Sequence, residues 1–407
     1  MVRRTAILFL ALAGCGGGGS SAPPTPDAGI SNDIRPGKRS DIAALGDPAT
    51  GSIMVFGGND GPIVDQIPKA EYLGDTWRFD PDQGWTDVSG DTAPSARGRY
   101  AVSSDPAGRV LIYGGRWRQA GTSGNYTLYS DLWAFDTATN GWSEVDPGTT
   151  GAPSPRYYAV SAYDSDAGRL FVYGGDTNPS ALTINPSQEV WSYGGGAWQQ
   201  ESPTGTVPAP ARLYMAYTYD SQRNRLVVFG GQVGDFVSPG LNDLYALDLS
   251  TMTWSQLHDG TGTAPAGRFS AMMSYDAARD RYLVFGGHAD PGVANDLWAF
   301  DPTAGSWSEL ATGDTFTGGA LGCGGNAAEI PADYVNQDLT APERRSGGMF
   351  AVVGDSVWLF GGVSDCSDHL DDTWRYELVA DSWSQVIEAR SGESCARRND
   401  SCTCLCL

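Results

Sequence analysis

Arginine and acidic residues recur in this sequence at positions where they could bind a carboxylate or pair with one another. A guanidinium presents a planar fork of N–H donors that matches a carboxylate. The arginines could therefore hold an acidic ligand, or they could form ion pairs between neighbouring repeats, and both interpretations stay open. The arginines, each at the start of a short apolar segment, are Arg39, Arg97, Arg156, Arg212, Arg268 and Arg345, and the acids, each two residues before an aromatic residue, are Asp75, Asp131, Glu189, Asp243, Asp296 and Asp372.

Other groups that could perform catalysis are sparse. The chain has three histidines, His258, His288 and His369, and it contains no P-loop, G-x-S-x-G or H-E-x-x-H motif. The turns rich in aspartate offer too few carboxylates for a calcium site. The sequence therefore favours binding over catalysis and predicts neither a cofactor nor a metal site, with an enzyme that modifies sugars as the alternative.

The first of the seven cysteines, Cys15, has a distinctive setting. A short basic start precedes an apolar run from Ala6 to Ala13, which suits a secretory signal and is too short to span a bilayer. The run ends in Leu12-Ala13-Gly14-Cys15, which resembles the lipobox of bacterial lipoproteins. The resemblance implies that residues 1–14 are a signal peptide and that Cys15 is acylated. Residues 15–38, rich in Gly, Ser and Pro, then form a flexible linker.

The six remaining cysteines form an even set, which in a secreted protein indicates disulfides. We predict one between Cys323 and Cys366, because both belong to loops on one face of the fold deduced below. The other four, Cys395, Cys402, Cys404 and Cys406, lie in a C-terminal tail over residues 391–407. They could bind a soft metal, pair with thiols or belong to a poorly ordered end, which we favour, and their pairing stays open.

A repeat dominates the body of the chain. Each Gly doublet follows four apolar residues, such as Val110 to Tyr113 before Gly114-Gly115. A run without polar alternation indicates a strand buried on both faces, and the glycines end it where a side chain would clash or φ must be positive. The other doublets are Gly57-Gly58, Gly174-Gly175, Gly230-Gly231, Gly286-Gly287 and Gly361-Gly362.

Each unit is predicted to contain four antiparallel strands, a to d. An arginine opens strand a, the Gly doublet closes strand b, the acid opens strand c, and a further Trp lies in strand d. This order resembles the kelch repeat, and six copies resemble a six-bladed kelch β-propeller of the galactose oxidase type. The resemblance implies an all-β fold over residues 39–390, with an insertion at 311–343. We expect a monomer in which blade 6 closes against blade 1 without exchanging strands.

Strand parity separates two faces of such a ring. The a–b and c–d turns lie on one face, which we call the turn face, and the b–c and d–a loops lie on the other, the loop face. The loops that vary in length between repeats lie on the loop face, whereas the turns are short, so we expect the function on the loop face. In kelch propellers that recognise acidic peptides, arginines at matching positions contact the ligand. The resulting candidates on the loop face are Arg97, Arg156, Arg212, Arg268, Arg345, Trp117, Tyr126, Tyr129 and Phe236.

The formal net charge of −22 limits the partners. This charge repels phosphate backbones and anionic lipid, so we expect no nucleic acid and no membrane contact beyond a lipid anchor. The sequence thus predicts a lipid-anchored binding module of the bacterial cell envelope, periplasmic or surface-displayed, whose ligand is a protein, peptide or glycan. A sugar isomerase or oxidase working in the channel and a structural envelope protein are the alternatives.

Overall fold

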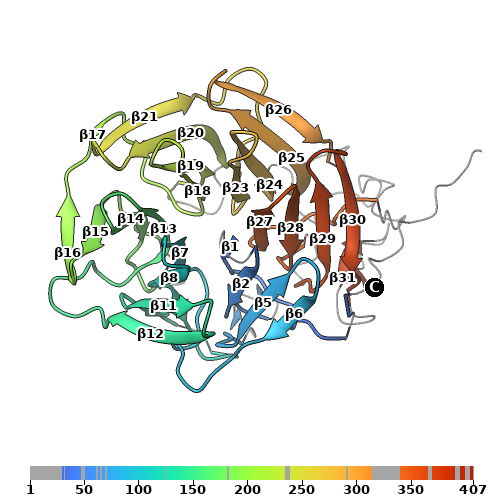
Figure 1. Cartoon of the computed structure of the whole chain (residues 1–407), viewed down its shortest axis with the longest axis horizontal. Coiled ribbons are helices and arrows are strands. Elements are labelled where there is room, and N and C mark those ends of the chain that lie inside the picture. The colour runs from blue at the N-terminus through green and yellow to red at the C-terminus, as the bar shows by residue number, and fades with distance from the viewer. Residues whose placement is uncertain are drawn as a thin grey trace, which may run out of the picture.

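The strands of this protein form six sheets arranged around a central axis (Figure 1). The computed structural model describes residues 30–31, 33–46, 51–60, 63–64, 67–68, 71–122, 124–180, 183–233, 239–289, 292–313, 340–364, 369–389, 395–398 and 404–406. Every regular element in these ranges is a strand. None of the described residues belongs to a helix that could cross a membrane.

Each sheet is one blade with its strands in the order a, b, c, d from the axis outward. Blade 1 contains β1 (Ala44–Gly46), β2 (Ile53–Phe56), β5 (Thr76–Asp80) and β6 (Gly84–Asp87), and blade 2 contains β7 (Ala101–Ser104), β8 (Arg109–Tyr113), β11 (Leu132–Asp136) and β12 (Gly141–Asp146). Blade 3 contains β13 (Tyr157–Asp164), β14 (Arg169–Asp176), β15 (Val190–Gly194) and β16 (Ala197–Glu201), and blade 4 contains β18 (Ala216–Asp220), β19 (Arg225–Gly231), β20 (Leu241–Asp248) and β21 (Thr253–His258).

Blades 5 and 6 complete the ring. Blade 5 contains β23 (Met272–Asp276), β24 (Arg281–Ala289), β25 (Val293–Asp301) and β26 (Ser306–Ala311), and blade 6 contains β27 (Met349–Val353), β28 (Ser356–Phe360), β29 (Thr373–Glu377) and β30 (Ser382–Ile387). The strand β27 lies against β1 (Figure 1), so the ring closes between the last and first units. The predicted fold class, an all-β propeller of six four-stranded blades, is confirmed.

Several short strands add to this plan. β17 (Thr204–Gly205) pairs in parallel with β21, and β22 (Arg268–Phe269) pairs with β24 ahead of β23. The loop face carries two hairpins, β3 (Ile63–Val64) with β4 (Ile67–Pro68) and β9 (Arg116–Trp117) with β10 (Thr127–Leu128). The C-terminal tail forms a hairpin of β31 (Cys395–Arg398) and β32 (Cys404–Cys406), which corrects the expectation of a poorly ordered end there.

The core consists of six hydrophobic clusters, one in each interface between neighbouring blades. Strand b contributes side chains to two of these clusters, one on each of its faces. In β8, Val110 and Ile112 pack toward blade 1, while Leu111 and Tyr113 pack toward blade 3. Burying each such side chain stabilises the fold by about 1.5–3 kcal/mol. The uninterrupted apolar runs of the sequence therefore mark strands that lie between two interfaces.

The Gly doublets join each blade to the next through the backbone. Both glycines have positive φ, 68° and 102° at Gly114 and Gly115. A Cβ on Gly114 would lie 2.6 Å from the carbonyl oxygen of Arg156, the arginine that opens blade 3. The N–H of Gly115 donates to that same oxygen at 2.9 Å. The doublet is therefore a docking point for the neighbouring blade, which a side chain would block.

A second link between blades depends on one variable position, the residue between the acid and the aromatic residue in strand c. Where it is threonine, it accepts a hydrogen bond from a strand-d indole of the next blade: Trp142 Nε1 donates to Thr76 Oγ1 at 2.9 Å, and Trp85 Nε1 donates to Thr373 Oγ1 at 3.1 Å. Elsewhere the position is apolar, and among the described residues no acceptor reaches the indole N–H. The affected indoles are those of Trp198, Trp254, Trp307 and Trp383, opposite Leu132, Val190, Leu244 and Leu297.

Replacing Thr76 by Val should lower the free energy of unfolding by about 1–3 kcal/mol, because a buried indole donor loses its acceptor at constant side-chain volume. Chemical denaturation measures the change. Thr86→Val, on an exposed position of β6, is the matched control and should be nearly neutral. Equal effects of the two substitutions would show that the indole bond contributes nothing.

Packing begins before residue 39, where the sequence placed the end of the linker. Ile30 packs against the cluster between blades 6 and 1, next to Gly84. Arg35 is buried and its Nε lies 3.4 Å from Asp371 Oδ2 of blade 6. The last part of the predicted linker therefore belongs to the folded body. The lipidation site Cys15, the predicted bridge between Cys323 and Cys366, and most of the 311–343 insertion lie outside the described residues.

Candidate functional site

The six arginines that open the blades share one buried geometry on the loop face. Arg97 is representative: Nη1 and Nη2 donate to the two carboxylate oxygens of Asp131 at 2.5 and 2.9 Å, and Nη1 also donates to the carbonyl of Gly114 at 3.0 Å. The indole of Trp133 donates to the same carboxylate at 2.9 Å. Each arginine thus ties strands a, b and c of its own blade together.

The equivalent ion pairs confirm that arginines and acids meet on one face. They are Arg39–Asp75, Arg156–Glu189, Arg212–Asp243, Arg268–Asp296 and Arg345–Asp372. Burial alone would raise the pKa of Asp296, but its hydrogen bond and ion pair with Arg268 hold that pKa below its ordinary value.

The idea that these pairs join neighbouring repeats is wrong, because each pair forms within one blade. The arginine backbone does reach the neighbouring blade, through the Gly doublet. The geometry places the guanidinium groups of Arg97, Arg156, Arg212, Arg268 and Arg345 against carboxylates, almost without exposure. Their role as ligand contacts stays a prediction.

The aromatic candidates occupy different environments. Trp117 is half-buried on β9 and pairs with Thr127 of β10. Tyr126 is buried, and its ring is contacted by two arginines that the sequence did not single out, Arg116 at 3.9 Å and Arg118 at 4.2 Å. The ring of Tyr129 lies 3.8 Å from the guanidinium carbon of Arg97. Phe236 falls outside the described residues.

The structure reveals a ring of residues that sequence reasoning missed, each two positions after a strand-initial arginine. We call this ring the channel mouth. Each member has positive φ, between 52° and 66°, and backbone hydrogen bonds join several neighbours, such as Arg99 N to Asp41 O at 2.9 Å and Tyr158 N to Arg99 O at 2.8 Å. The members of the channel mouth are Asp41, Arg99, Tyr158, Tyr214, Ser270 and Gly347.

The channel mouth lines a central cavity of about 180 Å³. Tyr217 of blade 4 crosses this cavity, and its hydroxyl accepts a hydrogen bond from Val102 N of blade 2 at 2.8 Å. Burial raises the pKa of Tyr217 to about 12, so the hydroxyl keeps its proton at neutral pH. The inner edge of β7 would otherwise present unpaired backbone groups to the cavity. Tyr217 therefore narrows the channel beneath its mouth.

The side chains of the channel mouth differ from blade to blade although their backbones match. Arg99 Nε donates to Asp41 Oδ2 at 2.5 Å, and Asn59 donates to the same oxygen at 2.7 Å. Burial would raise the pKa of Asp41, but the charge of Arg99 beside it holds that pKa below its ordinary value. The ring of Tyr158 packs on Tyr214 with centroids 4.2 Å apart. One side of the mouth is thus ionic and the other aromatic.

The three histidines do not converge. His369 is buried, with Nε2 2.8 Å from Ser40 Oγ. His288 stacks on Phe269 with centroids 4.9 Å apart, and His258 Nδ1 accepts a hydrogen bond from Gly260 N at 3.0 Å. Within the described ranges no group of three or more His, Cys, Asp or Glu side chains could hold a metal ion.

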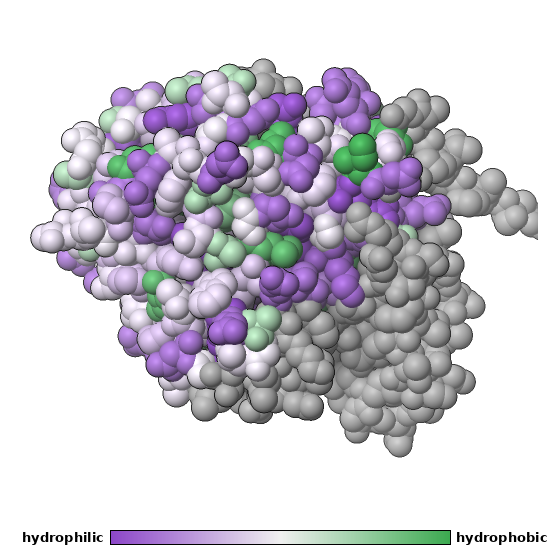
Figure 2. Space-filling model, turned by 90° about the horizontal axis from the view of Figure 1, so that it is seen from below, coloured by the Kyte–Doolittle hydropathy of each residue, from purple (hydrophilic) through white to green (hydrophobic). Residues whose placement is uncertain are grey.

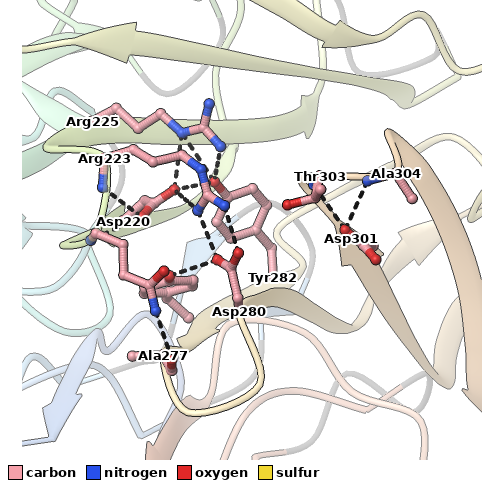
Figure 3. A network of polar contacts seen from close by, with 11 residues as sticks. Asp220, Arg223, Arg225, Ala277, Asp280, Tyr282, Asp301, Thr303 and Ala304 are labelled. Atoms are coloured by element: carbon pink, nitrogen blue, oxygen red, sulfur yellow. Dashed lines mark hydrogen bonds and ion pairs between the residues drawn. The ribbon is translucent and has the colours of Figure 1, made fainter.

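The turn face carries ion pairs that do join blades (Figure 3). Arg223 of blade 4 donates to Asp280 of blade 5 at 2.7 Å, and Arg279 of blade 5 donates to Asp355 of blade 6 at 2.6 Å. Tyr282 of blade 5 donates to the buried carboxylate of Asp220 in blade 4. These polar groups of the turn face therefore bind one another across the interfaces between blades.

The outer surface offers little hydrophobic area. Figure 2 shows hydrophilic and neutral residues over most of the described surface in that view, with hydrophobic residues scattered among them. The large hydrophobic side chains exposed within the described ranges are Ile34 and Val379. Recognition through a broad apolar patch is therefore not what this surface favours, and the polar and aromatic loop face remains the candidate.

Comparison with known proteins agrees with this architecture. The Leucine-zipper-like transcriptional regulator 1 homolog of Drosophila melanogaster is 25% identical over 340 residues, 80% of this chain and 30% of that protein. Kelch domain-containing protein 10 of Rattus norvegicus is 28% identical over 246 residues, 58% of this chain and 57% of that protein. The flagellar outer-arm dynein alpha chain of Chlamydomonas reinhardtii is 26% identical over 274 residues, 64% of this chain and 6% of that protein.

The chain therefore spans little more than half the length of these relatives at most. The family model described as the KLHDC2/KLHL20/DRC7 Kelch-repeats domain matches residues 28–194 and again residues 169–324. Together these matches cover most of the chain, and they include the first five units in which the arginine, Gly-doublet and acid signatures were found. By its repeats, its six blades and this match, the chain belongs to the Kelch-repeat family.

Proposed function

We propose that this protein is a binding module whose loop face engages a protein or peptide partner, with a glycan as the alternative ligand. The channel mouth carries the proposal. Six positions with the same backbone geometry carry an aspartate, an arginine, two tyrosines, a serine and a glycine, whereas the strand-initial arginines beside them are held in ion pairs of the scaffold. Side chains that vary on a scaffold of constant backbone geometry are expected of a recognition surface.

The chemistry of the mouth suits a partner with polar and apolar groups. Tyr158, Tyr214 and Phe269 form an aromatic series whose successive centroids lie 4.2 and 5.6 Å apart. Such rings can stack on a sugar or anchor an apolar side chain. Membership of the Kelch-repeat family supports a protein partner, because its propellers generally mediate protein interactions.

The enzyme alternative predicts an acidic pair with raised pKa values inside the channel. Asp41 is the carboxylate that lines the central cavity, and its pKa is lowered. Among the described residues, the carboxyl whose pKa is raised is Glu309 on β26, an outer strand, where burial is the main cause. These observations favour the binding module.

Affinity capture from envelope extract tests the proposal. Trp117→Ala combined with Tyr214→Ala should abolish capture of the partner, because both side chains lie on the loop face and neither is fully buried. Ser165→Ala combined with Asp166→Ala, in an exposed a–b turn, is the matched control and should leave capture intact. Loss of capture in the control pair alone would place the site on the turn face. A glycan array run in parallel separates a sugar ligand from a protein.

We also propose that the module is anchored to a bacterial envelope through an acylated Cys15. The lipobox and the linker that follows support this anchor, and two or more acyl chains suffice for stable attachment. The relatives described above come from animals and an alga, so they lend no support to a bacterial source. Cys15→Ala should leave an unprocessed or soluble protein, which detergent partitioning and mass spectrometry detect. Unchanged processing and partitioning of the variant would refute the anchor.

A further inference from the structure

The C-terminal hairpin places two cysteines at the same level of its backbone pairing. In the register of β31 and β32, Cys395 lies directly opposite Cys406, and Arg398 lies opposite Cys404. The pairing shifts between Cys395 and Arg397, so a bulge separates these two cross-strand pairs. If Cys323 and Cys366 pair as predicted, the remaining cysteines can still pair with one another in several ways. The register of the hairpin distinguishes between them.

Backbone spacing favours one pairing of Cys395. Residues directly opposite in an antiparallel pair have Cα atoms about 4.5 Å apart without mutual hydrogen bonds and about 5.5 Å apart with them. Both separations lie within the range of about 4.4–6.8 Å that a disulfide spans. Cys404 lies diagonally across from Cys395, where Cα atoms are about 7–8 Å apart, beyond the reach of an unstrained bridge. Among the described cysteines, Cys406 is therefore the one that Cys395 can reach without movement of the backbone.

The composition of the hairpin does not account for its pairing. β31 reads Cys-Ala-Arg-Arg and β32 reads Cys-Leu-Cys, so neither strand contains the β-branched or aromatic residues that favour strands. The two strands form a sheet of their own. An isolated two-stranded hairpin is at best marginally stable in water. A covalent link between opposite positions is the feature of this segment that can hold the register.

We propose that Cys395 and Cys406 form a disulfide that closes the C-terminal hairpin. The two thiols are oxidised by glutathione disulfide or by the disulfide of a thiol oxidoreductase. The S–S bond of that oxidant breaks as the new bond forms, and its two sulfurs take up the electrons and protons of the cysteines to become thiols. The inference rests on the proposed export of the chain, because structural disulfides persist outside the reducing cytoplasm.

Peptide mapping of the full-length protein tests the pairing. The protein is isolated from the cell envelope with iodoacetamide present, which blocks free thiols, and is digested with trypsin without reduction. Cleavage after the arginines of β31 separates Cys395, in peptide 391–397, from the other cysteines of the tail, in peptide 399–407. We expect these peptides to stay linked, to separate on reduction, and to carry the bond on Cys406 when the linked species is fragmented. Recovery of Cys395 in alkylated form, or bonded to another cysteine of peptide 399–407, would overturn the proposal.

Matched variants compare the two positions on β32 directly. Cys402→Ser combined with Cys404→Ser leaves Cys395 with Cys406 in the tail, and Cys402→Ser combined with Cys406→Ser leaves Cys395 with Cys404. Each purified protein is equilibrated with mixtures of reduced and oxidised glutathione, and the linked fraction is measured by the same mapping. The equilibrium constant for bridge formation should be at least about tenfold larger for Cys395 with Cys406, because the diagonal pair must distort the backbone. Equal constants, or a larger constant for Cys395 with Cys404, would overturn the proposal.

Failure of this inference can be told apart from failure of the proposed function. If Cys15 is processed and the loop face captures its partner while Cys395 is recovered in alkylated form, the bridge alone is refuted. If Cys15 is not processed and the chain is not anchored, the glutathione equilibria still decide the pairing, because they use purified protein and need no export. Support for the full inference requires linked peptides from envelope protein together with the preference of Cys395 for Cys406 in the purified variants.

Discussion

Arg345→Met should lower the free energy of unfolding by about 3–5 kcal/mol. Arg345 is fully buried, and its partner Asp372 has only 3% of its side chain exposed, the most buried acid among the six pairs. The guanidinium donates to both oxygens of Asp372, at 2.5 and 2.8 Å, and to the carbonyl of Gly361 at 3.1 Å. Removing it leaves a buried carboxylate uncompensated and breaks the side-chain link between the start of strand a and strands b and c.

Denaturant unfolding measures this change. Arg279→Met is the matched control, since its partner Asp355 is 73% exposed and solvent screens that pair, while its second partner, Asp276, lies 3.4 Å away and keeps an ion pair with Arg281. The control should change stability by about 1 kcal/mol or less. Similar losses in both variants would show that the strand-initial arginines are no more structural than surface arginines. That result would return them to the set of candidate ligand contacts.

Gly230→Ala should be almost as damaging, for a different reason. Gly230 has φ of 64°, and a Cβ there would lie 2.6 Å from Arg268 O and 2.7 Å from Leu241 O. Both obstacles are backbone atoms of packed strands: Arg268 belongs to blade 5, and Leu241 lies on the neighbouring strand β20 of blade 4. Neither can move without disturbing the contact with blade 5 or the strand pairing within blade 4. The left-handed backbone and the overpacking together should cost about 2–5 kcal/mol.

Gly305→Ala separates the two contributions. Gly305 has a similar φ of 67°, yet nothing lies within 4 Å of its added Cβ. It should therefore lose only about 1–2 kcal/mol from backbone strain. Thermal and denaturant unfolding of both variants test the difference. Equal losses would mean that the doublets serve only the turn of the chain and not the docking of the next blade.

The repeat could be read from the sequence because its signatures come from the backbone. Gly114 and Gly115 must be glycines because both have positive φ and the carbonyl of the next blade leaves no room for a side chain. The four residues before them must all be apolar because strand b packs against a neighbouring blade on each of its two faces. Parity could then place Arg97 and Asp131 on one face. It could not decide which blade supplied the acid, because that depends on distances across the ring. The error over ion pairs between blades arose there.

The channel mouth was harder to predict because its members occupy equivalent positions in the six blades but are not the same residue type. Asp41, Arg99 and Tyr158 look unrelated, and the available signal was their constant offset of two from a recurring arginine. The burial of Arg116 had no local signal at all. It results from the packing of the β9–β10 hairpin against blade 3, where Tyr126 N donates to Pro179 O at 2.8 Å.

Site-specific photo-crosslinking in envelope extract tests most directly whether the loop face is the binding surface. A photoreactive amino acid is placed at Trp117 on the loop face and, in a second protein, at Ser165 on the turn face. Both positions are accessible and lie outside the ion pairs that hold the blades together. We expect a defined crosslinked adduct from position 117 and none from position 165. An adduct formed from position 165 and absent from position 117 would contradict the account.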